Sequence, residues 1–148
     1  MRKLQGLRLV ADPDRVLRDL GPDALTVSRS DFAAAFAGLR RQVKTALVDQ
    51  TLIAGLGNLL ADEILWRARI SPRRPCHRLA ESDIATLHAR MRAVLRTSVR
   101  DERVPPRRGW LTGHRDDRPA VCPRCRTGLR RGRVGGRGTV WCPRCQES

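Results

Sequence analysis

The chain has 148 residues, and its 30 Lys and Arg residues outnumber its 15 Asp and Glu residues, which gives a formal net charge of +15 at pH 7. This length allows one main domain with a small appendage and excludes two large domains. No apolar run approaches the roughly 18 residues that a membrane span requires, so we expect a cytoplasmic protein with no membrane partner.

The positive charge predicts a polyanionic partner, and nucleic acid in particular. Lys3 and Lys44 are the only lysines, so almost all of this charge is guanidinium. A guanidinium group binds phosphate oxygens through two parallel N–H donors. A GC-rich genome, which favours arginine codons, would produce part of the same bias. From the positive charge we nevertheless expect a nucleoid-associated protein.

The first 27 residues are an irregular lead-in, in which Asp12-Pro13-Asp14 predicts the start of a short helix and Gly21-Pro22 its end. A capping-box variant follows at residues 28–31, and the apolar residues after it repeat with helical spacing. We expect a helix of about three turns there. Its apolar positions are Phe32, Ala35, Phe36 and Leu39.

Residues 43–68 predict two helices that meet at a tight glycine turn. An apolar stripe begins at Val43, is interrupted at Gly55-Leu56-Gly57-Asn58, and resumes until Pro72 stops it. Gly55 would end the first helix and Asn58 would cap the second. Backbone N–H groups and the positive end of the second helix would then point outward together, where an anion can dock. Simple capping without a ligand is the alternative.

A long amphipathic helix is predicted to begin at Ser82-Asp83. Between Asp101 and Ala120 the composition shifts to Arg, Pro, Gly and Asp, which predicts a linker or an irregular wrap. The apolar face of the helix comprises Ile84, Leu87, Met91, Val94, Leu95 and Val99.

Four of the five cysteines form two Cys-Pro-Arg-Cys knuckles, Cys122 with Cys125 and Cys142 with Cys145, separated by sixteen residues. This spacing is typical of a tetrahedral zinc site. The segment has too few apolar residues to fold alone, and zinc supplies on the order of 10 kcal/mol. With four thiolate ligands the zinc ion would be structural. An iron centre or a pair of redox disulfides are the alternatives.

The segment between the knuckles predicts a glycine-rich hairpin at residues 128–139. A tip without side-chain bulk can approach a phosphate backbone closely. Among its arginines, Arg137 lies between glycines and is the predicted specific contact, with Arg131 beside it. A solvated run of charge is the alternative.

Two motifs in this chain resemble the Fpg/Nei family of DNA glycosylases. Residues 43–50, 53–58 and 61–65 are similar to the family's helix-two-turn-helix signature, and residues 135–146 are similar to its zinc-finger ending. The resemblance extends from about Leu20 to Gln146, with both motifs in the family's order and spacing.

This resemblance implies a mainly α fold. Residues 1–110 would form a helix-two-turn-helix DNA-binding domain with a remnant lead-in, and residues 111–148 a four-cysteine zinc-ribbon hairpin. In the double-stranded DNA site that it implies, Asn58 binds a phosphate and Arg137 holds the backbone beside a damaged or abasic nucleotide. We expect Gly57, Lys44 and Arg131 to contribute to the same surface.

The family's chemistry uses an N-terminal proline as nucleophile and a neighbouring glutamate. Position 2 here is Arg2 and the first proline is Pro13, so we expect no catalytic residue in this chain. It would be a truncated recognition part of a base-excision repair glycosylase/AP lyase, served by a catalytic domain in trans if active. The amine of Met1 or Lys44 offers an alternative imine-forming group.

Two other functions account for part of the sequence. A non-enzymatic nucleic-acid or ribosome-associated zinc adaptor would explain the charge and the helix-two-turn-helix unit, and it predicts RNA binding without lesion preference. A zinc-dependent protein-interaction module would explain only the knuckles. Leu60, which stands where many family members carry Tyr, leaves the preferred damaged base open.

Overall fold

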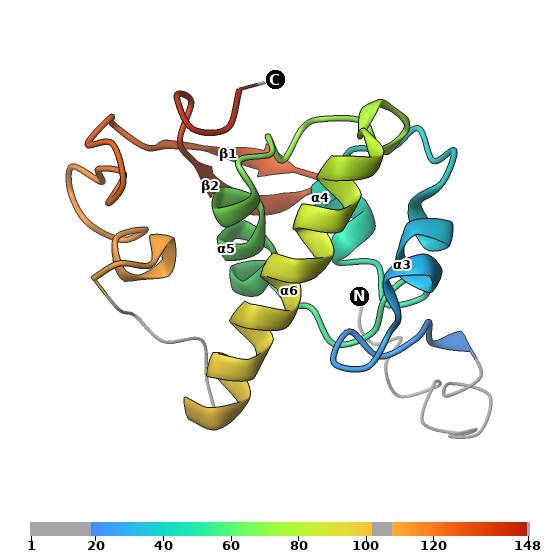
Figure 1. Ribbon diagram of the computed structural model, residues 1–148. Coiled ribbons are helices and arrows are strands. Elements are labelled where there is room, and N and C mark those ends of the chain that lie inside the picture. Colours follow the sequence, from blue (N-terminus) through green and yellow to red (C-terminus); the bar gives the residue numbers. More distant parts are fainter. Residues whose placement is uncertain (1–18, 102–107, 148) are drawn as a thin grey trace, which may run out of the picture.

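The computed structural model describes residues 19–101 and 108–147 (Figure 1). The helix predicted from Asp12 lies almost entirely outside these residues, and the lead-in Leu7–Val10 lies wholly outside them. The described elements, in chain order, are the helices α3 (Arg29–Phe36), α4 (Val43–Leu47) and α5 (Asn58–Ala68), the 3-10 turn η1 (Cys76–Arg78), helix α6 (Glu81–Asp101), the 3-10 turn η2 (Leu111–Gly113), and the strands β1 (Arg130–Val134) and β2 (Arg137–Trp141).

Helix α3 begins where the capping signal predicts it. The Ser28 hydroxyl accepts a hydrogen bond from the backbone N–H of Asp31 at 3.1 Å, which satisfies a donor of the first turn. The helix has eight residues instead of the expected three turns, because the chain becomes extended at Ala37. Phe32 and Phe36 are buried and meet edge to face, with ring centroids 4.7 Å apart.

The prediction of a tight glycine turn between two helices is wrong. Helix α4 ends at Leu47 and α5 begins at Asn58, so residues 48–57 form two successive turns. Asp49 closes the first turn by accepting hydrogen bonds from the backbone and hydroxyl of Thr51. Gln50 closes the second, because its side-chain Oε1 accepts from Gly55 N and its side-chain Nε2 donates to Leu56 O. These side-chain bonds add to the backbone bonds that Leu52 N and Ile53 N donate to Asp49 O.

Helix α6 is the longest element and packs against α5 and α3 (Figure 1). Of its predicted apolar face, Leu87, Met91, Val94 and Leu95 are buried. Val99 is 57% exposed, because the last turns of α6 project beyond the other helices (Figure 1). Within the residues that the structure describes, no helix has both the length and the apolar character to cross a membrane.

The hairpin lies along α5 (Figure 1), so the helical part of the chain and the zinc finger are in direct contact. The carbonyl of Gly138 in β2 accepts a hydrogen bond from Asn58, the first residue of α5. The backbone N–H of Val140 donates to Asp62, one helical turn further along α5. Trp66, nearer the end of α5, packs in a second cluster with Leu111, Cys122 and other residues of the finger. The fold is therefore mainly helical, with a small two-stranded sheet docked on its central helix.

We expect a methyl group at Gly21 to destabilise this fold. A Cβ there would lie 2.7 Å from the carbonyl oxygen of Thr51 and even closer to that of Leu52, and Gly21 N donates to Gln50 O at 2.9 Å. Backbone cannot move aside cheaply, so Gly21→Ala should lower the free energy of unfolding by about 1–3 kcal/mol. Urea denaturation measures this. Gly109→Ala is the matched control, because nothing lies within 4 Å of a Cβ there; an equal loss in both variants would contradict the prediction.

Candidate zinc centre and nucleic-acid interface

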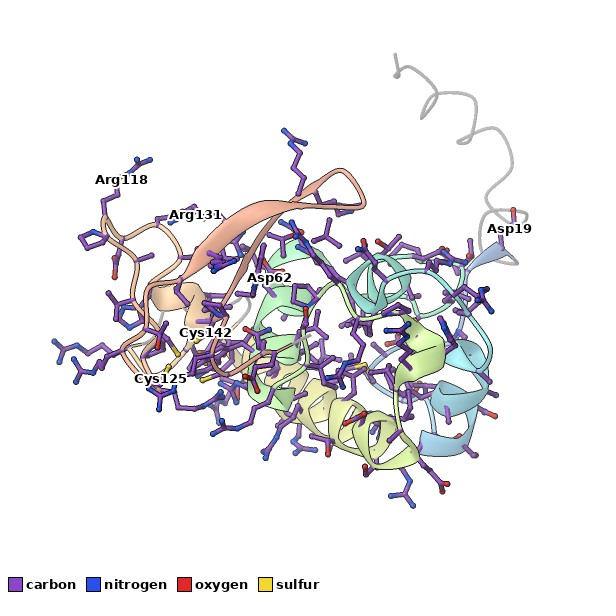
Figure 2. All side chains as sticks on the ribbon, turned by 90° about the horizontal axis from the view of Figure 1, so that it is seen from above. Asp19, Asp62, Arg118, Cys125, Arg131 and Cys142 are labelled. Atoms are coloured by element: carbon purple, nitrogen blue, oxygen red, sulfur yellow. The ribbon has the colours of Figure 1, made fainter. Side chains whose placement is uncertain are left out.

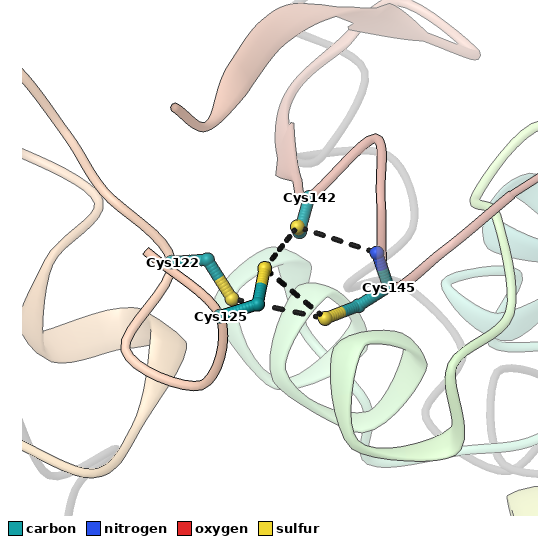
Figure 3. A group of neighbouring side chains, drawn as sticks. All are labelled: Cys122, Cys125, Cys142 and Cys145. Atoms are coloured by element: carbon teal, nitrogen blue, oxygen red, sulfur yellow. Dashed lines mark hydrogen bonds between the residues drawn. The ribbon is translucent and has the colours of Figure 1, made fainter. Parts of the chain in front are cut away.

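The four knuckle cysteines converge at one point between the finger loops (Figure 3). All four sulfurs lie within 4.8 Å of one another, and the Sγ–Sγ distances include 3.5 Å between Cys125 and Cys142 and 3.9 Å between Cys122 and Cys145. A zinc ion with bonds of about 2.3 Å to a tetrahedron of sulfurs needs edges of about 3.8 Å. The thiol set therefore fits one structural zinc ion and leaves no open coordination position.

The thiols differ in how readily they lose a proton. Burial raises the pKa of Cys142 to about 12, whereas hydrogen bonds from Thr127 lower the pKa of Cys125 to about 6. Zinc binds thiolates, so metal binding must displace the proton of Cys142. Zinc affinity is therefore expected to rise with pH.

A tryptophan of the helical part closes the zinc centre on one side. The indole Nε1–H of Trp66 donates to the sulfur of Cys122 at 3.3 Å. The guanidinium of Arg124 lies over the Trp66 ring at 4.1 Å and donates to the Trp66 carbonyl. Because Trp66 belongs to α5, the metal site is attached directly to the helical core.

The tip of the hairpin lies against α4, and the strand that follows the tip meets the start of α5. Strand β1 pairs antiparallel with β2 through the two-residue turn Gly135-Gly136, whose φ angles are +59° and +78°. A Cβ on Gly135 would lie 2.7 Å from the Thr45 hydroxyl, so glycine permits this approach. Arg137 is the first residue of β2 and is exposed. It therefore follows the tip instead of forming part of it.

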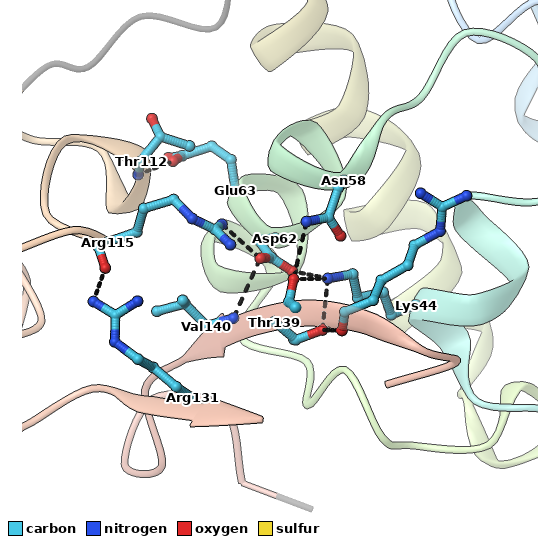
Figure 4. Close-up of polar contacts among 11 residues, drawn as sticks. Lys44, Asn58, Asp62, Glu63, Thr112, Arg115, Arg131, Thr139 and Val140 are labelled. Carbon is cyan, nitrogen blue, oxygen red and sulfur yellow. Dashed lines mark hydrogen bonds and ion pairs between the residues drawn. The ribbon is translucent and has the colours of Figure 1, made fainter. Parts of the chain in front are cut away.

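Asn58 is not the helix cap that its position predicts. The N-cap is Gly57, and Asn58 is the first residue of α5. The side-chain Nδ2 of Asn58 donates to the carbonyl oxygen of Gly138 at 2.9 Å (Figure 4). An amide nitrogen has two N–H donors, so one can bind the hairpin while the other faces a ligand. The helix start and the residue after Arg137 are thereby joined.

Lys44 does not reach the surface where a DNA contact would lie. Its side chain is fully buried, and its Nζ lies 2.7 Å from Asp62 Oδ1 and donates to the Thr139 hydroxyl at 2.7 Å and to Gly138 O at 3.2 Å (Figure 4). Burial lowers the pKa of this ammonium group, and the Asp62 carboxylate opposes that effect. Lys44 therefore holds the hairpin from beneath.

Asp62, which lies beside the hairpin (Figure 2), receives the other contacts of this buried cluster. Its Oδ2 accepts from Arg115 Nη1 at 2.7 Å and from the backbone N–H of Val140 at 3.2 Å. The neighbouring Glu63 is also buried, which raises its pKa, and it accepts from Thr112 N while pairing with Arg67. Sequence reasoning missed Asp62 and Arg115, because a carboxylate on a predicted helix reads as a surface group.

The two remaining predicted DNA contacts, Gly57 and Arg131, lie in different places relative to the hairpin. Gly57 is exposed beside Asn58, at the open end of α5. Arg131 is exposed but pairs with Val140 in the register, so it projects from the opposite face of the hairpin to Arg137. Its guanidinium donates to the carbonyl of Arg115 (Figure 4). The structure thus brings Asn58, Gly57 and Arg137 together and leaves Arg131 apart.

A helix-two-turn-helix unit whose second helix is hydrogen-bonded to a basic, four-thiolate zinc hairpin defines a class of zinc-finger proteins. Residues 20–105 match the family model of the formamidopyrimidine-DNA glycosylase H2TH domain, and residues 121–147 match the zinc finger found in FPG and IleRS. The chain belongs to the formamidopyrimidine-DNA glycosylase family.

Individual relatives agree with this assignment. The formamidopyrimidine-DNA glycosylase of Roseiflexus sp. is 41% identical over 138 residues, which is 84% of this chain and 49% of that protein. That of Streptococcus pneumoniae is 35% identical over 148 residues, covering 89% of this chain and 53% of the relative. The chain spans about half the length of these curated relatives.

Solved structures show the same fold. The Lactococcus lactis Fpg in complex with DNA containing an abasic site superposes with a TM-score of 0.76 at 30% identity, over 92% of this chain and 55% of that one. A structure of MutM with DNA containing carbocyclic 8-oxo-G has a TM-score of 0.76 at 28% identity and covers 92% and 54%. The zinc-finger match and the four clustered thiols confirm the predicted zinc cofactor, and the matching family models and relatives confirm the family resemblance.

Removing zinc should unfold the finger before the helices. A chelator is expected to abolish the hydrogen bond from Trp66 to Cys122 and to disorder residues 121–147, because few apolar groups stabilise that segment without metal. The helical circular dichroism should remain. Two-dimensional NMR should show the Trp66 indole signal shifting on chelation, with Trp66→Phe identifying that signal. Loss of the helical circular dichroism together with the finger signals would contradict the prediction that the helices stay folded without zinc.

Lys44 and Asp62 should stabilise each other across the buried ion pair. Lys44→Met leaves the Asp62 carboxylate buried with one cation fewer, and a loss of about 3–5 kcal/mol in the free energy of unfolding is expected. Asp62→Leu also removes the partner of Arg115 and of the Val140 N–H, so the double variant Lys44→Met/Asp62→Leu is compared with both single variants, and its loss should be smaller than the sum of theirs. Urea denaturation of the three variants decides this. Additive losses would mean that the two charges do not stabilise each other.

Proposed function

We propose that this chain is the DNA-recognition module of a base-excision repair DNA glycosylase/AP lyase and that it binds duplex DNA at a damaged or abasic site. The hydrogen bond from Asn58 to Gly138 carries the proposal, because it sets the start of α5 and the exposed Arg137 in one surface. Either element alone would be a single weak anion contact.

The proposed surface has two kinds of donor for a DNA strand. The first-turn N–H groups of α5 and the second N–H of Asn58 suit one phosphate, and Arg137 suits a neighbouring phosphate through its planar fork. Gly57 adds no side chain, so a strand can approach the helix end closely. DNA as the partner is supported by the solved relatives, which include Fpg in complex with abasic-site DNA and MutM in complex with DNA containing carbocyclic 8-oxo-G.

The module is proposed to recognise the lesion without performing the chemistry. An imine-forming lysine must present a free amine to the sugar, and the Lys44 ammonium is buried against Asp62. The test is a gel experiment on zinc-loaded protein with an abasic-site duplex, run with and without borohydride. We expect a retained complex and no covalent adduct. An adduct would refute the assignment of a recognition role alone.

Arg137 should contribute far more to binding than an equally exposed arginine elsewhere on the finger. Arg137→Gln is expected to weaken binding to an abasic-site duplex at least about tenfold, because one charge-assisted phosphate contact is lost. Arg126→Gln is the matched control, because Arg126 is also exposed on the finger and this substitution removes the same charge. Fluorescence anisotropy measures both. Similar affinities for the two variants would show that only a diffuse positive field acts.

The same titration should separate Asn58 from a purely structural role. Asn58→Ala is expected to weaken binding to abasic-site DNA while leaving the melting temperature within a few degrees of the parent, because Gly57, not Asn58, is the helix cap. Equal affinity for undamaged RNA and abasic DNA in the parent protein would instead favour a ribosome-associated adaptor.

A further inference from the structure

A second basic site lies at the end of α5 remote from Asn58. It is a pocket of about 460 Å³ between the end of α5, helix α6 and the first zinc knuckle. Helix α5 spans Asn58–Ala68, so at 1.5 Å per residue the pocket lies about 16 Å along the axis from the proposed DNA surface. The side chains that define it are Trp66, Arg67, Arg69, Arg90, Trp110 and Arg124.

Two of the pocket arginines are held in place by aromatic rings. The Arg67 guanidinium lies 4.1 Å from the centre of the Trp110 ring, and that of Arg124 lies 4.1 Å from the Trp66 ring. Stacking orients a guanidinium plane without consuming all of its N–H donors. These side chains therefore lose little freedom when they bind an anion.

The other two arginines are not neutralised by any described residue. Arg69 and Arg90 are exposed, and their side chains form no hydrogen bond or ion pair among residues 19–101 and 108–147. Arg67 is paired with the buried Glu63 at 3.0 Å, but among the residues that the structure describes no Asp or Glu lines the pocket itself. Arg69 takes a left-handed conformation, φ +60°, to end α5. The pocket is thus concave, aromatic-walled and cationic.

We infer that this pocket binds a phosphodiester of a second DNA segment, apart from the duplex at Asn58 and Arg137. Guanidinium groups alone, without lysine, suit the two-pronged geometry of phosphate. The pocket and the Asn58 surface lie at opposite ends of α5, and the inference assigns a separate DNA segment to each. This inference rests on the proposed function only in taking DNA as the polyanion.

The experiment is a stoichiometric titration of the zinc-loaded protein with a short duplex by analytical ultracentrifugation and NMR. We expect two duplexes per chain at low salt. The second binding event should shift the indole N–H signals of Trp66 and Trp110. Two phosphate contacts correspond to about a tenfold loss of second-site affinity over a fourfold rise in salt.

Charge-matched variants separate the sites. Arg69→Gln/Arg90→Gln should bind one duplex with unchanged affinity at the first site, and Arg40→Gln/Arg78→Gln, which removes the same charge from exposed positions elsewhere, should still bind two. Asn58→Ala/Arg137→Gln should keep the pocket event alone. One duplex per chain in the parent protein, or equal losses in both arginine pairs, would overturn the inference. So would a polyglutamate peptide that displaces the second duplex at the same charge concentration as DNA.

The failure of this inference and that of the proposed function give different results. Absence of the second event with intact preference for an abasic site would remove the pocket and leave the proposed function standing. A second binding event without any lesion preference at the first site would support the pocket and refute the proposed function.

Discussion

The buried carboxylate of Asp62 is the interaction on which the arrangement of the two parts depends. It faces the Lys44 ammonium from α4, the Arg115 guanidinium from the loop after η2, and the backbone of Val140 in the hairpin. Three segments distant in the chain therefore meet at one side chain of α5. A charge cluster removed from water is strongly directional, so it fixes the hairpin in one position.

The zinc site and the ion cluster at Asp62 attach different ends of the hairpin to the helices. Near the end of α5, the thiolate site is attached through Trp66, which donates to Cys122. At the start of α5, Lys44 and Asn58 bind the carbonyl of Gly138. Because each end of the hairpin is attached separately, Arg137 projects from a surface that the helices determine. A finger held by its metal alone would leave that arginine free to move.

The positive charge of the chain is partitioned among distinct tasks. Lys44 and Arg115 are used internally against Asp62, and Arg124 covers the indole beside the zinc site. Guanidinium groups that keep N–H donors free of the fold, such as those of the exposed Arg137 and Arg69, can meet a polyanion. The net charge of +15 therefore overstates the charge available for binding, because part of it stabilises the fold.

The sequence by itself determined the zinc ligands and the start of α3, because knuckle spacing and a serine cap act within a few residues of chain. Other features depended on contacts between residues far apart in the sequence, which no local pattern encodes. Asn58 meets a carbonyl 80 residues away, and Lys44 meets a hydroxyl 95 residues away. Only the tertiary structure, in which the hairpin docks along α5, decided that Lys44 is buried and that Asn58 joins two parts of the site.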